Sequence, residues 1–431
     1  MVQQPSSGQG ASDQAQQPSS LEERFAALTQ TIQAHPMDAA ARLERGRLYA
    51  EQGQLVEALN DMSAAIHLNP GYAEAYYSRG FLYAQLQDWP HALADLNEAI
   101  RLNPSLVGAY HSRALVLINQ GNLQQALADL NEAIHLEPTR ASAYVHRGML
   151  SLQLGNPQQA LADFSEALRL NPQDHESYVR RGNLYLQQGD LPRALADFSE
   201  AIRLVPNDAS AYQSRALVHA YQGNVQQALS DLNEAIRLVP TPASAYSNRG
   251  DLYKRLGDFQ RALADFNEAL RLDPTNAVTF TNRGDVYFQL GDLQRALADF
   301  NEALRLEPGF APAYVNRAEV RLRQGDRQGA LADLNEAIRL RPDYARALFL
   351  RGQLASESQD FRQALADFSE VIRYWPDYAP AYLHRGMVQG LLGDLNAALA
   401  DVEQAHRLRP DDPEINRALA MVREAKRRQP R

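Results

Sequence analysis

Residues 243–276 read ASAYSNRGDLYKRLGDFQRALADFNEALRLDPTN, and nearly all of the chain consists of copies of this stretch. Small and aromatic residues recur in it at spacings of three and four, at Tyr246, Gly250, Tyr253, Ala262, Phe266 and Ala269. This period predicts two amphipathic helices. Between them, Gly257 can take the left-handed position that ends the first helix, and Asp258 can accept backbone N–H bonds as the N-cap of the second. The stretch is therefore expected to fold as a helical hairpin that turns at Gly257.

The hairpin recurs every 34 residues, without an insertion or a deletion. Pro274 ends its second helix, because the ring clashes with a preceding carbonyl and has no N–H to donate. The same proline recurs at Pro36, Pro70, Pro104, Pro138, Pro172, Pro206, Pro240, Pro308, Pro342, Pro376 and Pro410. Eleven complete repeats, numbered 1 to 11 below, therefore occupy residues 39–72, 73–106, 107–140, 141–174, 175–208, 209–242, 243–276, 277–310, 311–344, 345–378 and 379–412.

The repeat resembles the tetratricopeptide repeat family, whose 34-residue helix–turn–helix has small residues and a proline at these places. The resemblance covers residues 39–412, in the variant form Tyr-x-x-Arg-Gly that residues 246–250 show. It implies an all-α fold, a right-handed α-solenoid or superhelix of antiparallel helix pairs. In such a solenoid each repeat buries its apolar face only against its neighbours.

The two ends of the chain differ from the repeats. Residues 1–20 are rich in Gln, Ser and Pro and contain no apolar run, which predicts a disordered tail. Residues 21–38 predict an orphan N-terminal capping helix, and residues 413–431 predict a C-terminal capping helix. Polar-faced end helices keep a finite stack soluble, so end-to-end polymerisation is expected to be disfavoured.

One pair of charged residues recurs in every repeat. Arg249 and Asp265 each lie eight residues from Gly257, so antiparallel packing places them across from one another. Every repeat has to close its hairpin, and a pair that is present in every repeat is explained by that shared need. We therefore interpret the pair as structural rather than as part of an anion-binding ladder. Loss of one partner should cost roughly 3–5 kcal/mol if the pair is buried, and about 0–1 kcal/mol if it is exposed.

Composition and charge argue against several classes of function. The net charge of −9, with Lys254 and Lys426 as the only lysines, argues against a surface that binds nucleic acid or an acidic membrane. No run approaches the roughly 20 apolar residues of a membrane span, and the N-terminus lacks the apolar region of a secretory signal. The expected location is therefore the cytoplasm. The absence of Cys rules out disulfides and Cys-ligated zinc.

Function is expected where the repeats differ. On each first helix, residues equivalent to Tyr246, Gly250 and Tyr253 form the stripe that packs in the hairpin, and the opposite stripe is free to contact a partner. The family resemblance implies that this opposite stripe lines a concave groove where relatives bind extended peptides or partner helices. Contiguous apolar surface of this kind tends to mark a binding site. In repeats 2–4 this stripe holds an apolar zone of Tyr77, Phe81, Leu115, Val145 and Met149. Ile118 and Leu152 lie beside it, and contact with the next helix explains them equally well.

In repeats 7–9 the same stripe holds an acidic row, Asp251, Asp285 and Glu319. These carboxylates could receive a basic side chain, although a solvated face accounts for them slightly better. Our hypothesis for the ligand is a protein or peptide with an apolar anchor followed by a basic residue.

A chaperone clamp is disfavoured. Relatives that hold the acidic C-termini of heat-shock chaperones use a Lys and an Asn on one first helix. Here the Lys position holds no lysine in any repeat, and Asp251 next to Asn248 would repel an acidic tail.

No catalytic, cofactor-binding or metal-binding residue is predicted. No two histidines lie three or four residues apart, and neither a phosphate-binding loop nor a Gly-x-Ser-x-Gly turn occurs. Repeat 10 departs most from the others, and its Phe349, Tyr374 and Trp375 are either a second contact site or the product of neutral drift.

The sequence thus favours a non-catalytic scaffold that binds a partner in the groove during the assembly of a complex. The alternative is a regulatory or targeting subunit whose catalytic chain is separate, and a weaker alternative is an RNA-binding solenoid.

Overall fold

The computed structural model describes residues 20–240 and 242–428, and every regular element within them is an α-helix. The tail expected at residues 1–20 lies outside the described residues except for Ser20, whose side chain caps the first helix. The chain divides into two compact parts, Met1–Pro206 and Asn207–Arg431. No helix in the described ranges is long and apolar enough to cross a membrane.

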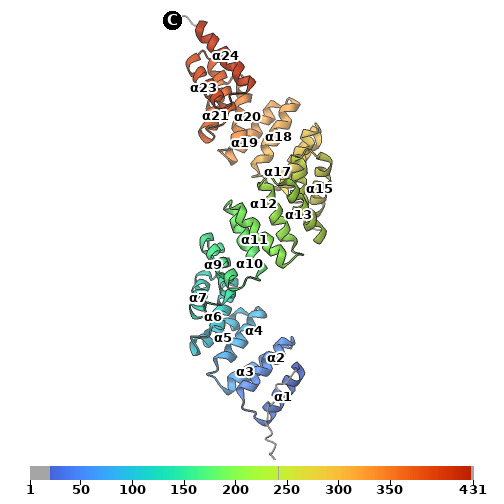
Figure 1. Cartoon of the computed structure of the whole chain (residues 1–431), viewed down its shortest axis with the longest axis vertical. Helices are drawn as coiled ribbons and strands as arrows, with labels where there is room; N and C mark the ends of the chain where they lie inside the picture. Colours follow the sequence, from blue (N-terminus) through green and yellow to red (C-terminus); the bar gives the residue numbers. More distant parts are fainter. Residues whose placement is uncertain (1–19, 241, 429–431) are drawn as a thin grey trace, which may run out of the picture. The chain divides into compact units, whose positions relative to one another are not determined.

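The N-terminal part consists of antiparallel helix pairs that follow one another along the chain (Figure 1). Its helices are α1 (Leu21–Ala34), α2 (Ala39–Glu51), α3 (Leu55–Leu68), α4 (Ala73–Gln85), α5 (Trp89–Leu102), α6 (Val107–Asn119), α7 (Leu123–Leu136), α8 (Ala141–Gln153), α9 (Pro157–Leu170), α10 (His175–Gln187) and α11 (Leu191–Leu204). Even numbers are the first helices of the repeats and odd numbers the second helices.

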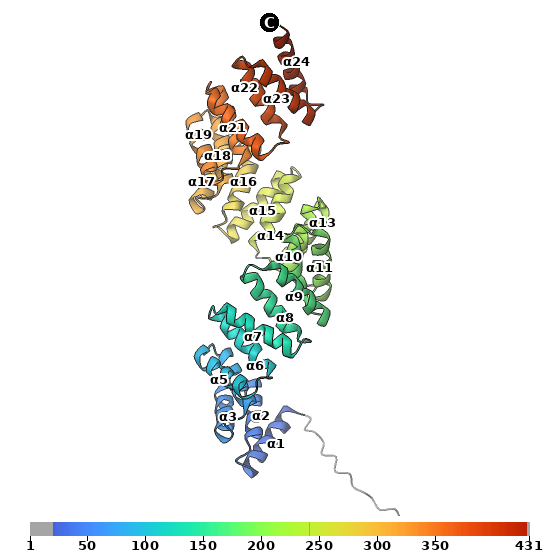
Figure 2. The same cartoon turned by 90° about the vertical axis from the view of Figure 1, so that its left-hand side faces the viewer.

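The C-terminal part repeats this arrangement, as Figure 2 shows from a second side. Its helices are α12 (Ala209–Tyr221), α13 (Val225–Leu238), α14 (Ala243–Arg255), α15 (Phe259–Leu272), α16 (Ala277–Gln289), α17 (Leu293–Leu306), α18 (Ala311–Gln324), α19 (Arg327–Leu340), α20 (Ala345–Glu357), α21 (Phe361–Tyr374), α22 (Ala379–Leu391), α23 (Leu395–Leu408) and α24 (Pro413–Arg428).

The turn of the hairpin has the geometry that the sequence predicts. Gly257 takes a φ of 77°, and the Asp258 side chain accepts a hydrogen bond from the backbone N–H of Arg261 at 3.1 Å. A Cβ on Gly250 would lie only 2.8 Å from the Phe266 ring, so the helices approach each other as closely as a glycine allows. At the same turn in repeats 2 and 10, Gln87 and Gln359 adopt φ values of 61° and 62°, an uncommon conformation for residues with a side chain.

The core lies along each part rather than at one centre. Ala262 and Phe266 of repeat 7 are fully buried and share one cluster with Leu232 of repeat 6 and Val286 of repeat 8. The main helix contacts join helices that are adjacent or next but one in the chain. Each part is therefore an all-α solenoid of antiparallel helix pairs, in which a repeat is stabilised by its sequence neighbours. The right-handed superhelical path remains a prediction.

The two end helices cover the apolar faces of the neighbouring repeats. Ile32 of α1 is buried, and in α24 Ile415 and Leu419 are buried while Val422 is partly buried. The exposed side of α24 is not wholly polar, however, because Met421 is 72% exposed.

Candidate interaction surface

The recurrent Arg–Asp pairs are ion pairs with little contact to solvent. Arg249 donates to Asp265 through Nε at 2.8 Å and through Nη2 at 2.7 Å, and the Asp265 residue is only 6% exposed. The bidentate bond with Asp265 raises the pKa of Arg249, while burial opposes this. The equivalent ion pair is present in all eleven repeats.

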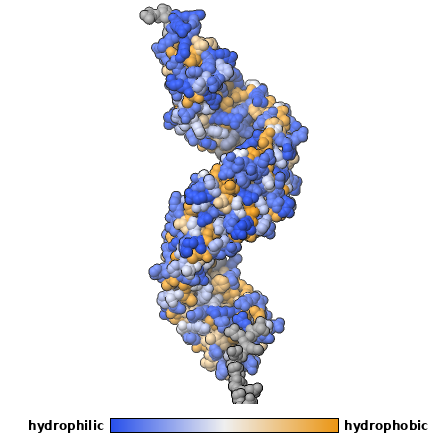
Figure 3. Space-filling view, in the orientation of Figure 1, coloured by the Kyte–Doolittle hydropathy of each residue, from blue (hydrophilic) through white to orange (hydrophobic). Residues whose placement is uncertain are grey.

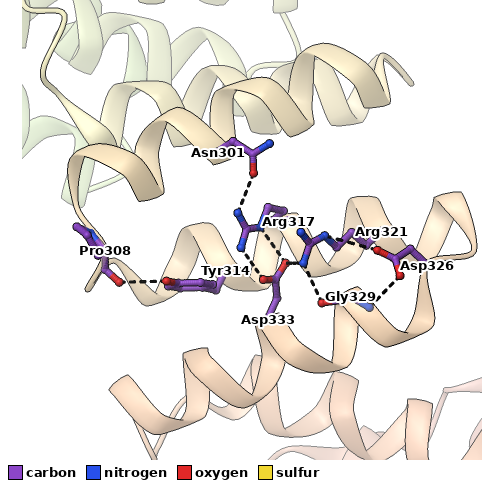
Figure 4. A network of polar contacts seen from close by, with 8 residues as sticks. All are labelled: Asn301, Pro308, Tyr314, Arg317, Arg321, Asp326, Gly329 and Asp333. Atoms are coloured by element: carbon purple, nitrogen blue, oxygen red, sulfur yellow. Dashed lines mark hydrogen bonds and ion pairs between the residues drawn. The ribbon is translucent and has the colours of Figure 1, made fainter.

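Arginines of this pair also bond to the second helix of the preceding repeat, a contact that was not predicted from the sequence. Arg249 donates from Nη1 to the side-chain oxygen of Asn233 on the second helix of repeat 6, at 2.7 Å. Figure 4 shows the same arrangement in repeat 9, where Arg317 lies between Asp333 and Asn301. The arginine therefore joins two repeats as well as closing one hairpin, and this structural use leaves it unavailable as an anion-binding ladder.

The apolar zone of repeats 2–4 contains its most exposed side chains at one position of the repeat. Phe81 on α4 is 42% exposed and Met149 on α8 is 37% exposed, while Leu115 on α6, between them in the sequence, is half-buried. The spacing of 34 residues gives these three side chains the same position on successive first helices. A pocket between α2 and α4 is lined by both Tyr77 and Phe81, so the surface is hollowed at this point.

The other residues of this stripe divide between packing and exposure. The Tyr77 ring packs near Gly108 of the next repeat, and Val145 packs against the cluster of Ala160 and Phe164. Ile118 packs against the core, whereas Leu152 is 37% exposed. Phe81 and Met149 are thus the exposed residues of the apolar zone, and the half-buried Leu115 has the same position of the repeat on the first helix between theirs in the sequence.

The acidic row of repeats 7–9 is already paired within the chain. Asp251 lies 3.1 Å from Lys254 Nζ and 2.8 Å from Arg255 Nε, and Glu319 forms a bidentate pair with Arg346 at 2.7 and 2.9 Å. Asp285 accepts a hydrogen bond from Asn316 Nδ2 at 2.7 Å.

Burial raises the pKa of Asp285, and the positive charge of Lys254 opposes that rise. The carboxylate is therefore neither fully solvated nor unpartnered. A basic side chain of a ligand would have to displace the partners that the three acidic residues already have.

Two histidines of the N-terminal part lie close together on successive first helices. His111 Nε2 on α6 lies 2.9 Å from His146 Nδ1 on α8, and the same Nδ1 lies 2.8 Å from the carbonyl oxygen of Ser142. Burial, with the nearby His146, lowers the pKa of His111 to about 4, and burial also lowers that of His146. The two histidines lie 35 residues apart on different helices, so the stacking of repeats brings them together and the spacing within one helix does not predict the pair.

The aromatic residues of repeat 10 do not form one patch. Phe349 packs between Phe368, Tyr378 and His384, with ring centroids 5.1–5.7 Å apart. Trp375 is 54% exposed, and Tyr374 contacts the guanidinium of Arg373. Phe349 is therefore a packing residue, and only Trp375 of the three is clearly accessible.

Further apolar positions of the first helices were missed by the sequence analysis. In the C-terminal part, a pocket bounded by α12, α14 and α16 has the exposed Tyr221 and Val278 in its lining. A second, almost wholly apolar pocket lies between α22 and α24 and includes Met387, Leu391 and Met421. Figure 3 shows one side of the C-terminal part, on which hydrophobic residues form small areas in a mainly hydrophilic surface.

Solved structures with a similar arrangement are helical repeat proteins. A chain of the APC/C hetero-tetramer Cut9–Hcn1 aligns with a TM-score of 0.52 at 13% identity, covering 93% of both chains. Yeast Tom70 aligns at 0.44 and 18% identity, covering 91% of this chain and 96% of its own. A tetratricopeptide repeat protein from Parabacteroides merdae aligns at 0.46 and 22% identity, over 58% of this chain and 99% of its own. At such identities the likeness concerns the fold alone.

Among curated proteins no sequence matches the chain. Models of the tetratricopeptide repeat, by contrast, match it along most of its length. The matches cover residues 26–62, 46–87, 80–145, 147–209, 182–247, 243–276, 277–310, 315–356 and 349–413. With the helical hairpins and their stacking described above, these matches show that the chain belongs to the tetratricopeptide repeat family.

Proposed function

We propose that the chain is a non-catalytic protein–protein interaction scaffold that binds a peptide or a partner helix during the assembly of a complex. Proteins of this family generally act as scaffolds rather than as catalysts. The partner would lie on the first-helix face of repeats 2–4 and would present an apolar anchor to Phe81, Leu115 and Met149.

The observation that carries this proposal is the register of these three side chains. An extended peptide or a helix can contact all three, because they occupy one position on three successive first helices of the N-terminal part. A partner that covers these side chains removes their remaining exposed surface from water. Full burial of an exposed side chain of this size contributes roughly 1.5–3 kcal/mol, and each of these contributes less because it is already more than half buried. Arg47 and Glu51 border the pocket at Phe81 and can orient a polar group of the partner.

The test compares two variants of the full chain as bait in the native cell extract. The first is Phe81→Asp/Leu115→Asp/Met149→Asp, which places carboxylates on the proposed face. The matched control is Val56→Asp/Gln124→Asp/Gln158→Asp, whose three positions are also related by multiples of 34 residues but lie exposed on second helices. Both variants add the same charge.

Binding on the first-helix face predicts that partners recovered with the parent chain and with the control are lost with the first variant. Equal recovery with both variants would contradict the proposal, provided that both retain the helical circular dichroism of the parent. Recovery of RNA in place of protein would favour the RNA-binding alternative.

A further inference from the structure

The exposed side of the last helix carries a stripe that is complementary to itself. Glu414, Arg417, Met421, Glu424 and Arg428 recur at spacings of three and four residues on α24, so they lie on one face. All five are exposed, and the buried Ile415 and Leu419 lie on a different face of the helix. The stripe begins with a carboxylate, ends with a guanidinium and has its large apolar residue at the centre.

Two copies of this stripe match when they run antiparallel. With Met421 opposite Met421 of the second copy, Glu414 of each helix faces Arg428 of the other, because both residues lie seven positions from the centre. Arg417 and Glu424 lie four and three positions from the centre and meet within about 1.5 Å of the same level, given the rise per residue of an α-helix. One two-fold axis therefore creates four pairs of opposite charge around a methionine contact.

The surroundings of the stripe suit a close helix contact. Ala418 and Ala425 flank Met421 one turn away on either side, and their small side chains let a second helix approach. Beside them, α22 adds an apolar wall of Met387 and Leu391, which are 46% and 70% exposed. Helices that associate through an apolar strip bury surface which a monomer leaves in water.

We propose that two copies of this chain associate through α24, antiparallel and about a two-fold axis at Met421. Such an interface is isologous, so it closes at two copies and does not lead to a polymer. Helix α24 has 16 residues and is about 24 Å long. Its contact area falls at the small end of specific interfaces, and the dimer therefore dissociates on dilution.

The existing contacts of the stripe leave this pairing available. Arg428 Nε donates to Glu424 of its own helix at 2.9 Å, an exposed pair that water screens. Arg423, on the other side of α24, is held by Glu403 of α23 at 2.9 Å and takes no part in the stripe. The opposite ends of α24 keep opposite charge, which disfavours a parallel arrangement of the two helices.

The test is sedimentation of the full chain over a wide range of concentration. Five proteins are compared: the parent, Glu414→Arg, Arg428→Glu, the double variant with both charge changes, and Met421→Glu. Each single change turns two symmetric attractions into repulsions and should weaken the dimer about tenfold or more. The double variant exchanges the charges and should restore the parent affinity. Met421→Glu, which places two carboxylates at the axis, should abolish the dimer.

Three results would overturn the proposal: a parent that stays monomeric at the highest concentration, a dimer that neither single change weakens, or a double variant as weak as the single ones. Thermal melting of each variant serves as the control for folding. The changed side chains are exposed, so the helical signal should match that of the parent.

Discussion

At the scale of single residues, the Arg–Asp pairs should make the largest difference to stability. Asp265→Ala leaves the Arg249 guanidinium partly buried, with Asn233 as its remaining partner. Removal of one member of a buried pair costs roughly 3–5 kcal/mol. Urea unfolding should show a loss of this size for the transition that includes repeat 7.

The matched control for this substitution is Glu268→Ala on the same helix. Glu268 pairs with Arg271 in an exposed i,i+3 bridge, so its loss should leave the urea transition unchanged. Equal effects of the two substitutions would show that the buried pair is dispensable.

The histidine pair leads to a prediction about pH. The pKa of His111 in the folded protein, about 4, lies below the ordinary value of 6.5, so the unfolded chain takes up this proton first. Stability from the neutral histidine is complete above pH 6.5 and is lost as the pH falls toward 4. From pH 7 to pH 5 the parent should lose about 1–2 kcal/mol more than His111→Gln, at about 1.4 kcal/mol per pKa unit.

Urea unfolding at the two pH values measures this difference. His67→Gln, at an exposed position of α3, is the control and should follow the parent. A parent and a His111→Gln variant with the same pH dependence would show that the pair does not oppose protonation.

Residue contacts within a repeat could be predicted from the sequence, but those between repeats could not. The distances of Arg249 and Asp265 from the turn were enough to place them together. The contact of Arg249 with Asn233 and that of His111 with His146 depend on how one hairpin stacks on the next, which the spacing inside a hairpin does not specify. The paired state of Asp285 was missed for the same reason, since its partner Asn316 belongs to the following repeat.

At the scale of elements, the repeats should be interchangeable. The sequences of α15 and α17 differ only at their first residue, Phe259 against Leu293, so α18 would find nearly the same surface on either helix. Deletion of residues 277–310 should therefore give a folded protein with a melting temperature close to that of the parent, because neighbouring repeats supply each other's core.

Deletion of residues 277–292 is the informative control. It removes α16 with its turn and leaves α17 without the helix against which Ala296 and Phe300 pack, so the protein should melt at a lower temperature. A similar fall for both deletions would show that the 34-residue repeat is not the unit of folding.

The boundaries of the helices could be predicted from glycine, aspartate and proline at fixed places in the repeat. The residues exposed on the last helix could not be predicted in this way. The end helix expected at residues 413–431 is present as α24, and its Ile415 and Leu419 are buried. Met421 and the neighbouring Leu391 were not identified, because an end helix is expected to be polar on its outer side. Exposure depends on what lies beside a helix, and the periodicity of one helix does not contain that information.

At the scale of the whole molecule, repetition fixes the structure while variation at one position of the first helices defines the candidate surface. Second helices carry nearly the same residues from repeat to repeat, as α15 and α17 illustrate. At the position of Phe81, by contrast, the residue is apolar in repeats 2–4 and acidic in repeats 7–9. Neither pattern specifies the partner, since many apolar segments fit the surface that Phe81, Leu115 and Met149 form.

Hydrogen exchange of the full chain, with and without the partner recovered by the parent bait, tests the proposed surface most directly. Binding across Phe81, Leu115 and Met149 predicts slower exchange in α4, α6 and α8 and no change in α5, α7 and α9. Protection confined to the second helices α5, α7 and α9 would contradict it.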